Sequence, residues 1–170
     1  MIKKTDKNGL VVLGVDPGTA ITGYGIIQDK GSRFHALDYG CIRPPASRKL
    51  SDRYWIIFSG LSDIIEKYSP DMVVVETQYV DKNVASALKL GMARGGVIIA
   101  AKQFGLPVME YAPTKAKLAV TGNGQASKRQ VQEMIKRLLN LSKMPPPDAA
   151  DALALALCQL HNKQSRGCEI

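Results

Sequence analysis

Short apolar runs and helix-length amphipathic stretches alternate along most of the chain. Continuous apolar runs bounded by turn residues are typical of strands that are covered on both faces. Pro and Gly mark where these runs stop, as in Asp16-Pro17-Gly18 directly after the first of them. The pattern predicts five strands, at Leu10–Val15, Thr22–Gln28, Phe34–Ile42, Met72–Val75 and Pro107–Tyr111.

Apolar positions at helical spacing occupy most of the remaining chain. Three strands, a helix and then alternating strands and helices predict an α/β domain with helices on both faces of the sheet. The domain is expected to span residues 10–162, between a flexible basic arm (1–9) and a flexible tail (163–170). The predicted helices cover Leu50–Lys67, Asn83–Phe104, Thr114–Val120, Ser127–Leu139 and Asp148–His161.

The composition adds one informative feature, which is an excess of basic over acidic residues. The 170 residues include 23 Lys and Arg but only 15 Asp and Glu, a net charge of +8. A basic protein of this size often binds a polyanion, because each Lys or Arg placed on a phosphate releases condensed counterions. The charge alone also fits a basic, solubilising surface, so it does not decide the function.

The cysteines and the apolar windows bear on the cellular compartment. Cys41, Cys158 and Cys168 form no C-x-x-C pair, which argues against a disulfide framework and for a reducing compartment. We expect no signal peptide in the lysine-containing start, and no window that approaches the roughly 20 apolar residues of a membrane span. The sequence therefore predicts a soluble, cytoplasmic protein with no membrane partner.

Two acidic residues stand at the ends of predicted central strands. Asp16 could be a plain turn residue, because Asp-Pro-Gly is an ordinary turn sequence. The small residues that follow it, Thr19, Gly23 and Gly25, keep the next strand free of bulk, where a ligand backbone could approach. Glu76 closes the most apolar strand, and ligands of open α/β sheets gather at such carboxyl ends.

Two more acidic residues lie at the start of the last helix. Asp148 follows three prolines, so an N-cap is its ordinary interpretation. Asp151 shares a helix face with it and is embedded in an Ala- and Leu-rich stretch suited to burial. An unpaired buried carboxylate is costly, and a cation would offset that cost.

Four carboxylates at two strand ends and one helix start can hold Mg²⁺ or Mn²⁺, which prefer oxygen ligands. Two such ions roughly 3.5–4 Å apart can activate water and stabilise the leaving oxygen of a phosphodiester. Competing chemistry is weakly supported, because the two histidines, His35 and His161, lie far apart and no P-loop motif is present. His161 is better explained as a helix C-terminal residue.

Three motifs in order resemble the RuvC family of Holliday junction resolvases. They are Leu13-Gly-Val-Asp16-Pro-Gly-Thr-Ala-Ile-Thr-Gly-Tyr-Gly25, Ala85-Ser-Ala-Leu-Lys-Leu-Gly-Met-Ala-Arg-Gly95 and Asp148-Ala-Ala-Asp-Ala-Leu-Ala154. The resemblance runs from about Val11 to His161 and implies a ribonuclease H-like, mixed five-stranded sheet. It implies a homodimer that resolves four-way DNA junctions during recombination and repair by symmetric nicking of two strands of like polarity, with Mg²⁺.

The resemblance also assigns residues. Asp16, Glu76, Asp148 and Asp151 match the family's catalytic and metal-binding carboxylates, with two ions per site and Mn²⁺ as a substitute; some members carry His at the position of Asp148. Tyr79 stands where the family generally has a Phe that stacks at the junction centre. Lys117 and Lys128 match its basic positions, and we assign Lys82, in the loop of Tyr79, to DNA binding with them. The resemblance further implies that part of the Asn83–Phe104 helix forms a dimer interface. It also implies a T-rich preferred cleavage sequence and the RuvA–RuvB branch-migration complex as a partner.

Three alternatives stay open. An actin-like ATPase or kinase fragment could use the turn after Asp16 to cradle phosphate, although the chain has little room for a second lobe. A non-catalytic DNA-binding module would explain the charge but not four acidic residues. A nuclease that acts on ribosomal RNA precursors shares the opening motif. Without the resemblance, Lys117 and Lys128 would be read as ordinary helix-surface lysines.

Overall fold

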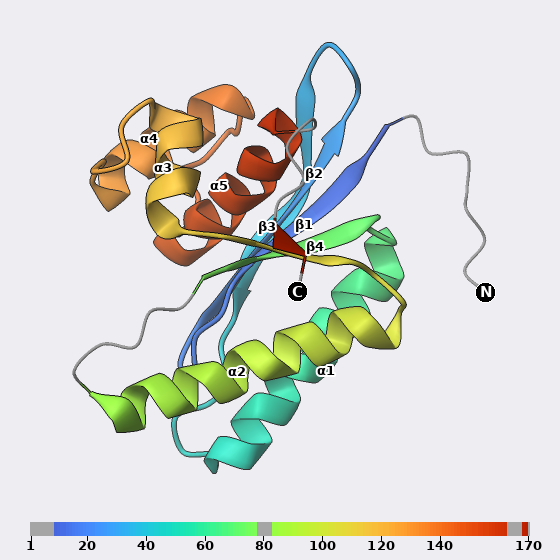
Figure 1. Ribbon diagram of the computed structural model, residues 1–170, viewed down its shortest axis with the longest axis vertical. Coiled ribbons are helices and arrows are strands. Elements are labelled where there is room, and N and C mark those ends of the chain that lie inside the picture. Colours follow the sequence, from blue (N-terminus) through green and yellow to red (C-terminus); the bar gives the residue numbers. More distant parts are fainter. Residues whose placement is uncertain (1–8, 78–82, 163–167, 170) are drawn as a thin grey trace.

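A six-stranded mixed sheet separates the helices into two layers (Figure 1). The computed structural model describes residues 9–77, 83–162 and 168–169. The strand order is β3-β2-β1-β4-β5-β6, antiparallel from β3 to β1, parallel from β1 to β5, and antiparallel again at β6. The strands are β1 (Val11–Asp16), β2 (Thr22–Asp29), β3 (Phe34–Ile42), β4 (Met72–Glu76), β5 (Val108–Tyr111) and β6 (Cys168–Glu169).

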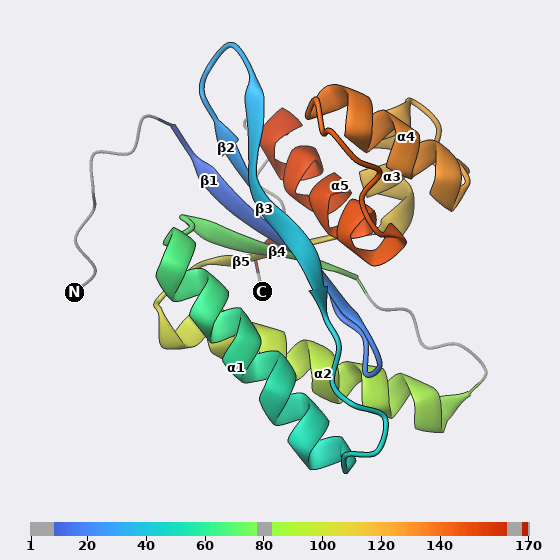
Figure 2. The ribbon, with the colours of Figure 1, turned by 180° about the vertical axis from the view of Figure 1, so that it is seen from behind.

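Helices cover both faces of this sheet, as predicted (Figures 1 and 2). The layer that contains α3, α4 and α5 lies on one face, and α1 and α2 pack together on the other. The predicted α/β architecture, a mixed sheet with helices on both faces, is therefore confirmed. The helices are α1 (Leu50–Tyr68), α2 (Val84–Gln103), α3 (Pro113–Thr121), α4 (Lys128–Leu138) and α5 (Pro147–His161).

The short strand β6 is an addition to the predicted five. It lies within 163–170, where the sequence predicts a flexible tail, and it pairs antiparallel with β5 at Met109 and Glu110. An edge strand offers unpaired N–H and C=O groups, which a neighbouring extended segment can satisfy. A two-residue strand has no periodicity by which the sequence could reveal it.

The two central strands bury side chains on both faces, which explains their unbroken apolar sequence. On β1, Val12 packs with α5, whereas Leu13 and Val15 pack with α1 and α2. Val74 and Val75 of β4 are divided between the same two layers, and all five side chains are fully buried. This two-sided core fixes the position of the strand ends at which Asp16 and Glu76 stand.

Glycines on β1 and β2 allow α5 to lie unusually close to the sheet. A Cβ at Gly14 would stand 1.9 Å from the main-chain oxygen of Ala152, and one at Gly23 would stand 2.1 Å from that of Asp148. The expectation that Gly23 and Gly25 leave space for a ligand backbone is therefore wrong. The backbone that approaches them is the first half of α5, and it carries two of the candidate carboxylates.

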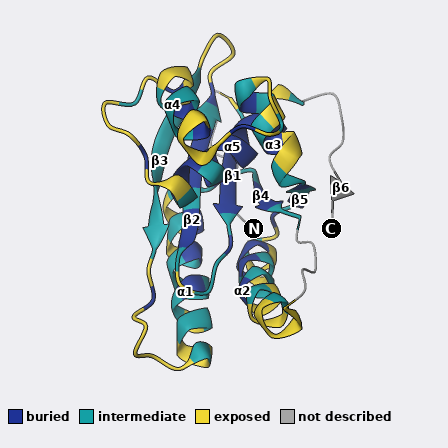
Figure 3. Cartoon of the chain, turned by 90° about the vertical axis from the view of Figure 1, so that its left-hand side faces the viewer, coloured by how far each residue is buried: buried dark blue, intermediate teal, exposed yellow. Residues whose placement is uncertain are grey.

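Helix α2 is apolar but only half covered. Its buried residues are Ala93, Val97, Ala100 and Ala101, and residues 84–92 include none that is buried (Figure 3). By length and composition α2 could cross a membrane, so the expectation that no window approaches a membrane span is wrong. Core helices of soluble proteins have the same length and composition.

The close approach of α5 leads to a stability prediction. Gly14→Ala should lower the free energy of unfolding by about 1–3 kcal/mol, because the added methyl group overlaps a main-chain oxygen that cannot easily move. Gly96→Ala on α2 is the matched control, since the nearest described atom beyond its own stretch of helix, the main-chain oxygen of Tyr54, is 4.0 Å from the new Cβ. Helix propensity should leave the control neutral or up to about 1 kcal/mol more stable. Urea denaturation measures both, and equal effects would contradict this account.

Candidate active site

Two parallel neighbouring strands bring Asp16 and Glu76 to the same edge of the sheet. Val15 of β1 is paired with Val75 of β4, and each acidic residue is the next residue along its strand. Both side chains are only partly covered, although the residues before them are fully buried. The strand ends thus place the two carboxylates side by side, as the sequence predicts.

Helix α5 adds acidic residues from above this edge. Asp151 lies one turn into the helix, with 24% of its side chain exposed, between neighbours that are fully buried. Asp148 lies in the first turn of the helix, and Pro146 rather than Asp148 is the N-cap. The N-cap interpretation of Asp148 is therefore wrong.

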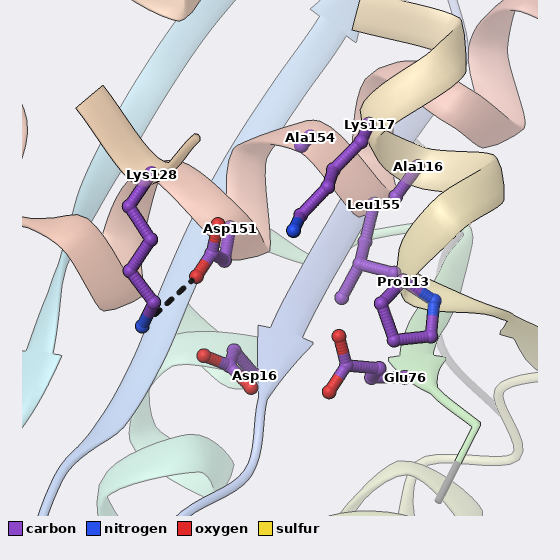
Figure 4. A pocket seen from close by; sticks show the side chains of 9 residues that line it. All are labelled: Asp16, Glu76, Pro113, Ala116, Lys117, Lys128, Asp151, Ala154 and Leu155. Atoms are coloured by element: carbon purple, nitrogen blue, oxygen red, sulfur yellow. Dashed lines mark ion pairs between the residues drawn. The ribbon is translucent and has the colours of Figure 1, made fainter. Parts of the chain in front are cut away.

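A cavity of about 260 Å³ opens between these elements, and Figure 4 shows the side chains that line it. Asp16 and Glu76 lie along one side, with Asp151 across from them. Lys117 of α3 points toward the space between the carboxylates, and Lys128 of α4 lies 3.7 Å from an Asp151 oxygen. The lining is completed by Pro113, Ala116, Ala154 and Leu155.

Asp148 stands slightly apart from this arrangement. It is not among the cavity-lining residues, but its charge acts on both Asp16 and Asp151. Three of the four predicted carboxylates thus meet at one cavity, and the fourth lies close enough to influence them electrostatically.

The carboxylates destabilise one another's charged form. Burial, reinforced by the charges of Glu76, Asp151 and Asp148, raises the pKa of Asp16 to about 7 from its ordinary value of 3.8. Burial also raises the pKa of Glu76 and of Asp151, and in both cases Lys117 and Lys128 oppose the rise. The two lysines therefore compensate part of the negative charge. A cation in the cavity would compensate more of it.

The donor chemistry fits a hard divalent cation, because the acidic side chains offer carboxylate oxygens and the described lining includes no sulfur or imidazole. The described side chains do not, however, form a closed set of three or more acidic, His or Cys ligands around one point. The carboxylates are spread around the wall of the cavity, and side-chain rotation would be needed to bring their oxygens onto a common ion.

The sequence analysis does not identify several residues that line the cavity or contact the loop next to it. Ala154 and Leu155 follow Asp151 by three and four residues, and Pro113 precedes Lys117 by four, so helical spacing could have identified them. Arg53 of α1 is different, because its Nη2 donates to the main-chain oxygen of Thr19 in the loop after Asp16. No sequence pattern signals that contact. Tyr79 and Lys82 lie outside the described residues, so their roles stay predictions.

The family model for crossover junction endodeoxyribonuclease RuvC matches residues 12–159, nearly the whole chain. The chain belongs to the RuvC family. A RuvC of Protochlamydia amoebophila is 61% identical over 152 residues, which cover 89% of this chain and 90% of that protein. A RuvC of Trichlorobacter lovleyi is 49% identical over 155 residues, 91% of this chain and 87% of that protein.

Solved structures agree with this RuvC assignment. Thermus thermophilus RuvC, in complex with a Holliday junction substrate, superposes with a TM-score of 0.87 at 30% identity and covers 95% of this chain and 99% of its own. The yeast mitochondrial Holliday junction resolvase shares the fold at 14% identity, with a TM-score of 0.61 over 92% of this chain and 82% of its own.

The raised pKa of Asp16 predicts that the ionised carboxylate lowers the stability of the folded protein. Between pH 3.8 and about 7 the folded state holds a proton on Asp16 that the unfolded state has released, so stability declines as the pH rises through this window. In EDTA at pH 8, Asp16→Asn should therefore stabilise the protein by about 2 kcal/mol, or roughly 4–8 °C in melting temperature. The gain should vanish at pH 4.

The matched control is Asp63→Asn, which removes a carboxylate from an exposed position on α1. It should leave the melting temperature within about 1–2 °C at both pH values, because an isolated surface substitution has little effect. Differential scanning calorimetry at one protein concentration compares the three proteins. If Asp16→Asn melted lower than the parent chain at pH 8, the electrostatic description of the cavity would be wrong.

Proposed function

We propose that this RuvC-family protein is a metal-dependent Holliday junction resolvase that nicks two strands of like polarity symmetrically. The observation that carries the proposal is the meeting of Asp16, Glu76 and Asp151 with Lys117 and Lys128 around one cavity. Carboxylates hold cations, and lysines attract the phosphates that carboxylates alone would repel. A cavity with both suits hydrolysis of a phosphodiester.

Each side chain has a distinct task in this proposal. Asp16 and Glu76, fixed at strand ends, are the rigid ligands, and Asp151 with Asp148 adds oxygens from α5. Two Mg²⁺ ions, replaceable by Mn²⁺, would supply an activated water and stabilise the leaving oxygen. Lys117 and Lys128 orient the phosphate over the carboxylates and offset the charge of the cavity. The Lys128 side chain is 68% exposed, so its pairing with Asp151 is weak enough to yield to a phosphate.

Junction selection extends beyond the cavity. We assign Tyr79 to stacking on a base at the branch point, where pairing is already disrupted, and Lys82 to the adjacent backbone. Stacking of one base on an aromatic ring is worth about 1–3 kcal/mol. The family resemblance supports a T-rich cleavage preference and functional coupling to the RuvA–RuvB branch-migration complex. The described cysteines Cys41 and Cys158 are free thiols, which fits a reducing cytoplasm.

We propose that a second copy of the chain covers α2. Val84, Leu88, Met92 and Ile99 are each more than 60% exposed and recur at helical spacing. At Gly91 and Gly95, no described residue outside the local helix backbone comes within 4 Å of an added Cβ, so a partner helix could approach closely there. Paired nicks in two strands require two active sites, which a twofold dimer provides.

Cleavage of a synthetic immobile four-way junction, with and without Mg²⁺, tests the activity on a denaturing gel. Asp16→Asn, Glu76→Gln, Asp148→Asn and Asp151→Asn should each reduce cutting by about 10²–10³-fold or more, because a cation ligand is lost. Junction binding should survive, since removing a negative charge lessens repulsion of the phosphates. Asp63→Asn is the control and should cut at the parent rate. Parent-like cutting by two or more cavity variants would rule out this site.

The dimer has a separate test. Leu88→Glu combined with Met92→Glu should shift the mass in sedimentation equilibrium from two chains to one, because charges at the centre of an apolar contact oppose association. Leu118→Glu, at an exposed apolar position on α3, should leave the mass unchanged. The α2 variant should also lose the coupling between the two nicks of one junction. A variant that stays dimeric would refute the α2 interface without touching the cavity assignment.

A further inference from the structure

A cluster of basic residues lies on the connection between β3 and α1, outside the site described above. The β3–α1 connection comprises residues 43–49, and its basic residues Arg43, Arg48 and Lys49 are all exposed. No acidic residue interrupts this stretch. Three positive charges in seven residues exceed what the composition of the chain would place there by chance. Like Lys117 and Lys128, these residues could attract phosphate groups.

One end of the connection is joined to the first turn of α5. Cys41, near the end of β3, is paired with Gly23, against which the main chain of Asp148 and Ala149 packs, and Arg43 follows Cys41 by two residues. Arg43 therefore stands beside the turn that carries the fourth carboxylate. The surface next to Asp148 is basic on this side, although the cavity itself is acidic.

The other end of the connection is joined to the loop that follows Asp16. Arg53, four residues after Lys49, donates a hydrogen bond from α1 to the main-chain oxygen of Thr19. The elements on either side of the connection, β3 and α1, thus contact segments that contain or directly follow candidate carboxylates. Pro44 and Pro45 restrict the backbone between them, and Pro44 is buried. Binding at such a restrained segment costs less conformational entropy than binding at a free loop.

The connection and the two lysines lie on different sides of the carboxylates. Figure 3 shows the connection as an exposed strip running from the end of β3 to the start of α1, whereas α3 and α4 lie at the opposite end of this view. Lys117 and Lys128 belong to α3 and α4. The end of the sheet at which Asp16 stands is therefore flanked by basic residues in two directions.

A DNA strand that crosses the cavity needs such flanks. The carboxylates repel the phosphates nearest to them, so the affinity must come from positive charges on either side. We infer that the β3–α1 connection is a second phosphate-binding flank, which holds the DNA backbone on the side of the carboxylates away from Lys117 and Lys128. This inference rests on the proposed function, and it adds a contact surface to it. Phosphate contacts position the duplex without reading its sequence.

The test compares two double variants with the same change of charge. Arg48→Ala with Lys49→Ala alters the connection, and Lys30→Ala with Arg33→Ala alters the exposed turn between β2 and β3, at the far end of the sheet (Figure 1). Affinity for a fluorescent four-way junction is measured by anisotropy in EDTA over a range of salt concentrations. The connection variant should lower the log–log salt slope by about 1–2 units, since each lost phosphate contact removes about 0.9. The turn variant should keep the parent slope.

Cross-linking locates the contact. Ser47→Cys on the connection and Ser32→Cys on the far turn are each labelled with a photo-activated cross-linker, and the parent chain with its three cysteines gives the background. Ser47→Cys should attach to nucleotides beside the cut, and Ser32→Cys should not exceed the background. Equal slopes in the two double variants, or no attachment at Ser47→Cys, would overturn the inference. A parent chain that neither binds nor cuts the junction would instead overturn the proposed function.

Discussion

The contact of α5 with the glycines of β1 and β2 is the constraint on which the rest of the molecule depends. A helix can lie this close to a sheet only where the strands carry no side chains, as at Gly14 and Gly23. The approach buries almost every residue of α5 after its first turn. It also sets the position of Asp151 relative to Asp16. The packing of the helix and the arrangement of the carboxylates therefore both depend on glycine at these positions. A methyl group at either glycine would disturb both together.

The cavity holds charges of opposite sign, and their interactions are stronger there than in water because the site is partly buried. Burial raises the pKa of Asp16, Glu76 and Asp151, and Lys128 lowers it for all three. The proposed function needs both kinds of side chain. Carboxylates without lysines would repel DNA, and lysines without carboxylates would hold no cation. The positive net charge of the whole chain then supplies attraction over a longer range.

Most of the fold could be predicted from the sequence, because continuous apolar strands and periodic helices carry strong local signals. Asp16 and Glu76 were predictable for the same reason, since strand ends are visible in the pattern. The role of Gly23 was not, because a sequence does not say which backbone will approach a glycine. The contact of Arg53 with Thr19 and the strand β6 depend on tertiary placement alone. Composition alone would place α2 in the core, because an apolar helix has the same composition whether it is covered or exposed, and only the family resemblance pointed to an uncovered surface on it.

The pKa of Asp16, close to 7, has a consequence for how the protein takes up cations. At neutral pH about half of the molecules carry a proton on this carboxyl group, and in the proposed site a cation would have to displace that proton to bind. Uptake of the metal would then be accompanied by release of acid into the medium. Below pH 7 the apparent affinity for the cation weakens as protons compete for the same oxygens, whereas above it the competition fades. The raised pKa of Asp16 would thereby make the occupancy of the proposed site depend on both the cation concentration and the pH.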